Sequence, residues 1–147
     1  MSRRNMREIL VHILYEYTFG CASCRTLAVQ RLAGEETLCT EGAPYQKPLS
    51  EPNRAALLEK ADEIELHLPA IDACIEQYAK GWELGRISKV ILAILRVAVY
   101  EILFDTALDD SIAVNEAVEI AKGYDEQETV AFINGILGSV IKGEKSA

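Results

Sequence analysis

The chain has 147 residues, of which 50% are hydrophobic and 26% charged, a balance typical of a folded protein with its own core and not of a disordered segment. The formal net charge of −8 argues against a general attraction to nucleic acid or to an anionic membrane, because the field of the whole molecule repels both. A nucleic-acid partner would therefore need a local basic patch.

No segment is predicted to be a secretory leader or a membrane span. Glu8, His12 and Glu16 interrupt the first apolar stretch, whereas a leader needs about 7–15 uninterrupted apolar residues. The most apolar run, residues 89–104, contains Arg96 and Glu101 and is shorter than the ~20 residues that cross a bilayer. We therefore expect a cytoplasmic protein without membrane contact.

The N-terminal half is predicted to contain two helical regions joined by a loop. Apolar residues at helical spacing predict a first helix that ends at about Phe19. Gly34, Gly42 and the prolines between residues 44 and 52 predict a connecting loop over residues 31–53, with room for a short helix inside it. Helical spacing resumes over residues 57–78, with a break or kink near Pro69 and an end around Gly81.

The C-terminal half is predicted to contain three further helices. Ser88 is the expected N-cap of a helix to about Phe104, which is apolar nearly all round and should be surrounded by other helices. Asp109 and Gly123 bound the next helix, and Thr129 begins the last one. The fold class predicted is an all-α bundle of about six or seven helices, with one helical subdomain over about residues 1–80 and another over about 82–143.

The sequence predicts neither a metal site nor a catalytic centre. Cys21 and Cys24 form a C-x-x-C, but the second close pair of a structural zinc site is missing, so we expect reduced thiols. His12 and His67 have no nucleophile at a telling spacing. We therefore expect a protein that is not an enzyme and needs no cofactor.

Positive charge is concentrated at the N-terminus. Residues 1–30 contain four arginines and two glutamates, whereas residues 101–128 contain nine acidic residues and Lys122 as the one basic residue. Arginine binds phosphate through a planar fork of donors and stacks on unpaired bases, so Arg3, Arg4 and Arg7 could form a compact RNA-facing patch. A solubilising N-terminus without a partner would explain the same residues.

Four stretches, in this order, resemble the NusB family of transcription antitermination factors. They are SRRNMREILVHILYEY at residues 2–17, ILRVAVYEILF at 94–104, IAVNEAVEIAKGY at 112–124 and TVAFINGIL at 129–137. The segment from about residue 21 to 65 has no recognisable identity to the family. Several separate motifs in one order make the resemblance more specific than any single motif.

The resemblance implies an all-helical RNA-binding protein in two subdomains, without catalysis. Family members bind single-stranded boxA RNA of ribosomal RNA leader transcripts together with the ribosomal protein that acts as NusE, and the pair joins NusA and NusG on RNA polymerase. The family pattern places RNA contacts at Arg3, Arg4, Arg7, Glu128, Thr129 and Phe132 of this chain.

The remaining motif residues, Arg96, Asn115, Glu116, Asn134 and Gly135, are expected to be structural. Asn115 and Asn134 lie beside positions predicted to be buried, so each is expected to hydrogen-bond across packed helices. Gly135 lies inside a predicted helix, where glycine costs about 1 kcal/mol relative to alanine, and it is therefore expected to mark close backbone packing.

The chain also departs from the family. Ile91 and Leu92 replace an acidic–basic pair and are expected to form an apolar partner surface. Asp109, Ser111 and Ala131 stand where members commonly carry proline or lysine, which lowers the positive charge. The alternative function is therefore a protein–protein interaction module, or a homodimer of the same fold, with weak or no RNA binding.

Overall fold

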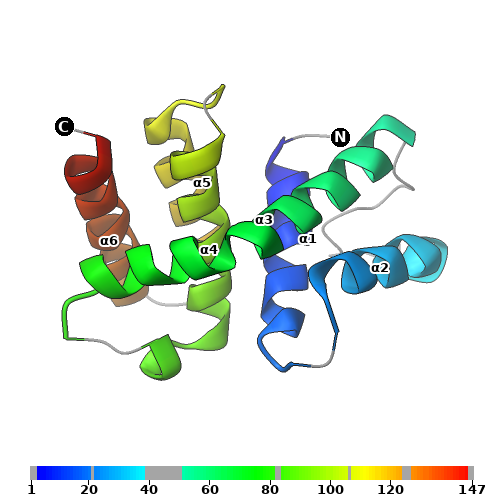
Figure 1. Cartoon of the computed structure of the whole chain (residues 1–147), viewed down its shortest axis with the longest axis horizontal. Helices are drawn as coiled ribbons and strands as arrows, with labels where there is room; N and C mark the ends of the chain where they lie inside the picture. Colours follow the sequence, from blue (N-terminus) through cyan, green and yellow to red (C-terminus); the bar gives the residue numbers. More distant parts are fainter. Residues whose placement is uncertain are drawn as a thin grey trace. The chain divides into compact units, whose positions relative to one another are not determined.

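The computed structural model describes residues 3–20, 22–38, 51–81, 84–105, 107–123 and 127–145. Within these ranges the chain forms six α-helices and one short 3-10 helix and contains no strand, which confirms the predicted all-α class (Figure 1). The elements are α1 (Arg3–Tyr17), α2 (Cys24–Leu38), α3 (Glu51–Tyr78), η1 (Leu84–Arg86), α4 (Lys89–Phe104), α5 (Asp110–Lys122) and α6 (Gln127–Lys145). None of the helices described is long and apolar enough to cross a membrane.

The chain divides into two compact units, Met1–Leu66 (unit 1) and His67–Ala147 (unit 2). This division lies inside α3, whereas the sequence places the subdomain boundary after that helix, near Gly81. Loop signals mark where a helix ends, but they do not show whether one helix contributes to two cores. The apolar spacing of α3 continues across the division, with Ile64 buried in unit 1 and Ile71 buried in unit 2.

In unit 1, α1 packs against α2. Ile9, Ile13 and Leu14 of α1 are fully buried, as the helical spacing of the sequence predicts. The end of α1 is fixed locally, because the Thr18 hydroxyl donates a hydrogen bond to the Leu14 carbonyl at 2.8 Å. Gly20 follows with φ +77, a left-handed conformation that glycine adopts without a steric penalty.

Helix α2 corrects the loop predicted over residues 31–53. The helix continues to Leu38, so the segment from Arg31 to Leu38 is helical, and α3 begins at Glu51, two residues before the predicted loop ends; residues 39–50 lie outside the described residues. The helix begins with a standard cap, in which the Ser23 side-chain oxygen accepts a hydrogen bond from the Thr26 backbone N–H at 3.1 Å. Gly34 is tolerated inside it, since glycine weakens a helix without ending it.

Helix α3 continues through Pro69 as one helix, where the sequence predicts a break or a kink. Proline removes one backbone hydrogen bond and disturbs the preceding turn, and the apolar residues Ile64, Leu68 and Ile71 around Pro69 are nevertheless buried. Pro52 lies in the first turn of α3, where a missing N–H costs little. Gly81, with φ +85, follows the end of the helix as predicted.

In unit 2, α4, α5 and α6 pack pairwise against one another (Figure 1). Every residue from Leu92 to Ile102 of α4 is buried, which confirms that this helix is surrounded. Its predicted cap is also present, because the Ser88 side-chain oxygen accepts a hydrogen bond from the Ile91 N–H at 3.3 Å. Helix α6 begins at Gln127, two residues before the predicted Thr129.

Candidate functional site

Arg96 joins α4 to the part of α3 that belongs to unit 2. Its Nε and Nη2 donate to Oδ1 and Oδ2 of Asp72, each at 2.9 Å, in the two-pronged geometry that suits a guanidinium and a carboxylate. The Arg96 side chain is 10% exposed and that of Asp72 is 25% exposed. In the part of the chain that the structure describes, Nη1 of Arg96 is buried without a hydrogen-bond partner. This motif residue therefore makes a structural contact between α3 and α4.

Of the three N-terminal arginines, the structure describes the side chain of Arg7 alone. Arg3 and Arg4 lie in the first turn of α1, and their side chains lie outside the described residues. Arg7, one turn further along, is only 5% exposed. A guanidinium this buried offers little surface to RNA, so Arg7 departs from the RNA-facing patch that the sequence predicts.

Two other arginines of unit 1 are held by carboxylates from neighbouring helices. Arg25 of α2 pairs with Asp62 of α3, and Arg31 of α2 pairs with Glu16 of α1. Burial lowers the pKa of His12, the Arg31 guanidinium lowers it further, and Glu16 opposes both effects. These two arginines are therefore engaged in the fold of unit 1.

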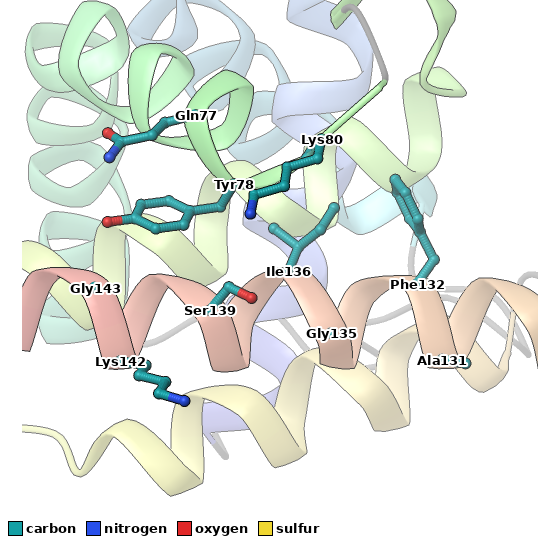
Figure 2. A pocket seen from close by; sticks show the side chains of 11 residues that line it. Gln77, Tyr78, Lys80, Ala131, Phe132, Gly135, Ile136, Ser139, Lys142 and Gly143 are labelled. Carbon is teal, nitrogen blue, oxygen red and sulfur yellow. The ribbon is translucent and has the colours of Figure 1, made fainter.

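An open cleft lies between the end of α3 and one face of α6, entirely within unit 2 (Figure 2). Its volume is about 780 Å³, in the range of ~300–1,000 Å³ typical of ligand sites. The residues that line it are Gln77, Tyr78, Ala79, Lys80, Ala131, Phe132, Gly135, Ile136, Ser139, Lys142 and Gly143. In Figure 2 the side chains of Phe132 and Ile136 point from α6 toward the segment of the chain that carries Tyr78 and Lys80.

One predicted RNA residue, Phe132, lines this cleft and is half-buried. Thr129 is half-buried one turn earlier on α6, and the side chain of Glu128 lies outside the described residues. The structure thus brings Phe132 together with Lys80 and Tyr78, which sequence reasoning did not select. The signal that could have found the α6 face is the spacing of four residues between Ala131, Gly135, Ser139 and Gly143.

Close packing occurs at Gly143 and not at Gly135, which corrects the prediction. A Cβ at Gly143 would lie 2.1 Å from the Tyr78 hydroxyl oxygen, so the ring occupies the space that any side chain would need. The Tyr78 hydroxyl donates to Oε2 of Glu144 at 3.0 Å. A Cβ at Gly135 would meet nothing within 4 Å, because this glycine is exposed on the open cleft.

The two asparagines also depart from their predicted role. Asn115 on α5 and Asn134 on α6 are both exposed, so neither side chain is buried between packed helices as predicted. Asn134 follows the fully buried Ile133, and one step along a helix turns a side chain by about 100°. Asn115 lies two residues from both Ala113 and Ala117, which are buried, and therefore on the opposite side of α5. Glu116 is half-buried.

Ile91 and Leu92, predicted to form an apolar partner surface, are not exposed together. Leu92 is 5% exposed and belongs to the core, and Ile91 is half-buried. The reason is the packing of α4, which is covered from Leu92 onward. Of the two residues, Leu92 therefore belongs to the core, and Ile91 lies at its edge.

The described cysteines are buried thiols. Cys24 and Cys74 are not joined in a disulfide, and burial together with the charge of Glu144 raises the pKa of the Cys74 thiol to about 11. Cys21 and Cys39 lie outside the described residues. Of the C-x-x-C motif, the structure therefore describes Cys24 alone. The described residues contain no group of three or more potential metal ligands.

Residues 4–142 match the model of the NusB family. A transcription antitermination protein NusB from Acetivibrio thermocellus is 39% identical over 142 residues, which cover 97% of this chain and 90% of the relative. A transcription antitermination protein NusB from Symbiobacterium thermophilum is 38% identical over 147 residues, which cover 100% of this chain and 94% of the relative.

Two solved structures share the fold. The NusB of T. maritima superposes with a TM-score of 0.79 at 27% identity, covering 97% of this chain and 92% of the other. A chain from the crystal structure of a plectonemic RNA supercoil superposes with a TM-score of 0.81 at 21% identity, covering 99% and 97%, and shows a shared fold.

Proposed function

Because the chain belongs to the NusB family, we propose that it acts in transcription antitermination by binding boxA-type single-stranded RNA of ribosomal RNA leader transcripts together with the ribosomal protein that acts as NusE. The observation that carries this proposal is the match to NusB antitermination proteins over nearly the whole chain. The mechanism involves no catalytic step: the protein holds RNA and partner in one assembly.

The proposed RNA contacts lie in two places, the first turn of α1 and the start of α6. Arg3 and Arg4 stand in the first turn of α1 and bind phosphates and bases. Arg7, being buried, acts on the position of α1 and not on RNA directly. Thr129 and Phe132, with Glu128 beside them at the start of α6, supply the second group of contacts.

The protein partner is selected by charge. Residues 101–128 contain nine acidic residues and one lysine, which suits a basic ribosomal protein. NusE would add RNA contacts that this acidic chain lacks, so that the two proteins bind RNA cooperatively through a composite surface. The assembly then joins RNA polymerase together with NusA and NusG. A homodimer or a protein-binding module without RNA is the alternative.

The test is fluorescence anisotropy of a labelled boxA-type RNA, titrated with the protein alone and with NusE over a salt series. The double variant Arg3→Ala/Arg4→Ala should weaken binding about ten-fold and should make the salt dependence shallower, since each lost contact to single-stranded RNA removes about 0.7 from the slope. The matched control is Arg25→Ala/Lys122→Ala, which removes the same charge from surface positions that pair with Asp62 and Glu119.

Circular dichroism of each variant checks that the helices are retained. An unchanged affinity and slope in Arg3→Ala/Arg4→Ala would remove these residues from the RNA site. A wild-type protein that binds no RNA, with or without NusE, would overturn the proposal and favour the protein-binding alternative.

A further inference from the structure

We propose that residues 65–70 of α3 form a flexible joint at which units 1 and 2 change their orientation relative to each other, and that bound RNA fixes this joint. The second half of the inference rests on the proposed function, because the RNA contacts proposed for this chain lie in both units. The joint itself rests on the backbone and the contacts of α3.

The first half of α3 is bound to unit 1 through α2. The backbone N–H of Cys24, at the start of α2, donates a hydrogen bond to Oε1 of Glu65 at 2.6 Å. One turn earlier on α3, Asp62 forms an ion pair with Arg25 of α2, and Ile64 is fully buried. These contacts hold the helix on unit 1 as far as residue 65.

The second half of α3 is bound to unit 2 through α4. The His67 ring stacks on the Phe104 ring of α4, with centroids 4.0 Å apart. One turn further along, Asp72 receives both hydrogen bonds from Arg96, and Ile71 is fully buried. The helix is therefore held on unit 2 from residue 67 onward.

Between these two sets of contacts, Pro69 weakens the helix itself. In an α-helix each backbone N–H donates to the carbonyl four residues earlier, so the bonds from residues 67–70 to residues 63–66 are those that cross the division between the units. Proline has no N–H, and its ring clashes with the carbonyl at the i−4 position, here that of Glu65. The backbone ladder is therefore interrupted at the point where α3 passes from one unit to the other.

The joint is open to water on one face. Leu66 is 74% exposed, and Pro69 and Ala70 are exposed as well. Sharp bends in helices occur at proline and where water enters the backbone ladder. Water that reaches this face can hydrate the Glu65 carbonyl, so bending at the joint costs less than bending elsewhere in α3.

The joint gives the proposed RNA contacts a variable spacing. Arg3 and Arg4 belong to unit 1, whereas Thr129 and Phe132 belong to unit 2. An RNA strand that binds both groups connects the two units and restricts the joint. Ordering the joint costs conformational entropy, which is part of the free energy of RNA binding.

The test is double electron–electron resonance between nitroxide labels carried on p-acetylphenylalanine, which leaves the buried thiols of Cys24 and Cys74 untouched. Labels at Val29 of unit 1 and Lys122 of unit 2 report on the joint, and labels at Gln77 and Lys122, both in unit 2, give the reference width. All three positions are exposed. In the free wild type, the distance distribution across the units should be broader than the one within unit 2.

Pro69→Ala restores the missing backbone N–H and should remove most of this excess width. Its matched control is Pro52→Ala, which should leave the width unchanged, because an N–H in the first turn of α3 has no partner within the helix. Circular dichroism checks that both variants keep their helices.

A second pair of variants moves the width in the other direction. Ala70→Gly should broaden the distribution further, because glycine weakens the helix at the joint. Ala73→Gly makes the same change at an exposed position outside the joint and should leave the width as it is in the wild type.

The same labels test the role of RNA. With NusE and a saturating boxA-type RNA, the distribution across the units should narrow in the wild type. Arg3→Ala/Arg4→Ala, which removes the proposed contacts of unit 1, should keep the broad distribution even at concentrations where anisotropy shows that the RNA is bound.

The outcomes separate this inference from the proposed function. A wild-type distribution that is as narrow across the units as within unit 2 would refute the joint, while RNA binding by anisotropy would leave the proposed function standing. A width that Pro69→Ala does not reduce would overturn the assignment to residues 65–70. A broad distribution that bound RNA does not narrow would refute the second half of the inference. If the wild type binds no RNA, the proposed function and the role of RNA fail, and the free protein still decides whether the joint exists.

Discussion

Units 1 and 2 use their basic side chains in different ways. In unit 1, Arg25 and Asp62 form an ion pair with side chains that are 55% and 48% exposed, where water and salt screen the attraction. In unit 2, the Arg96 side chain is 10% exposed and is bound by both oxygens of Asp72. Because a more buried ion pair leaves a costlier unpaired charge when one partner is removed, we expect the fold to depend more strongly on the Arg96–Asp72 pair than on the Arg25–Asp62 pair.

The units also differ in where basic groups remain available. Arg7 of unit 1 is buried although it stands in the most basic stretch of the sequence, whereas Lys80 of unit 2 lies on an open cleft in a strongly acidic chain. The exposure of a single basic side chain therefore does not follow from the local density of basic residues in the sequence.

The largest effect is expected at the Arg96–Asp72 pair. Arg96→Ala should lower the free energy of unfolding by about 3 kcal/mol, because it leaves a partly buried carboxylate without its partner. Arg25→Ala, the matched change in unit 1, should lower it by less than about 1 kcal/mol. Urea unfolding followed by circular dichroism measures both. Equal losses in the two variants would refute the contrast between the units.

A smaller effect is expected at two glycines of α6, and it tests the shape of the cleft of unit 2. Gly135→Ala should raise the free energy of unfolding by about 0.5–1 kcal/mol, since alanine favours the helix and its methyl group enters open space. Gly143→Ala should give no gain or a loss, because its methyl group would displace the Tyr78 ring and break the bond to Glu144. Urea unfolding is again the measurement, and a similar gain in both variants would contradict the close approach at Gly143.

The smallest effect is the pH dependence contributed by His12 of unit 1. Burial lowers the pKa of His12 in the folded state below its ordinary 6.5, so the unfolded chain takes up a proton first as the pH falls. The contribution of this group to stability is therefore complete above pH 6.5 and decreases as the pH drops below it. His12→Gln should flatten the stability curve over that window in urea unfolding at stepped pH. A curve as steep as that of the wild type would contradict the assignment.

Prediction from the sequence succeeded where one physical signal was sufficient. The apolar run of α4 predicted a surrounded helix with a cap at Ser88, and both are confirmed. Helix α2 was missed because its cap at Ser23 and its apolar residues Leu27 and Leu32 precede a stretch rich in glycine and proline. Continuity through Pro69 could not be predicted either, since the outcome depends on packing along the whole of α3.

The candidate site shows the same limit at the level of single residues. The sequence selected Phe132 through the family resemblance, but it gave no reason to combine that residue with Lys80, 52 positions earlier in the chain. It also predicted an exposed pair at Ile91 and Leu92, where the structure buries Leu92. Helical periodicity fixes the direction of a side chain relative to its neighbours in the helix, but not what another helix covers.

The sequence by itself determined the helical class, the ends of α4 and the membership of the NusB family, because helical periodicity, capping residues and ordered motifs are local properties of the chain. Only the tertiary structure decided that Arg7 is buried, that Arg96 binds Asp72 and that Gly135 faces an open cleft while Gly143 receives a tyrosine ring. These facts depend on which helices meet and at what distance, and long-range packing sets that arrangement after the local pattern has formed the helices.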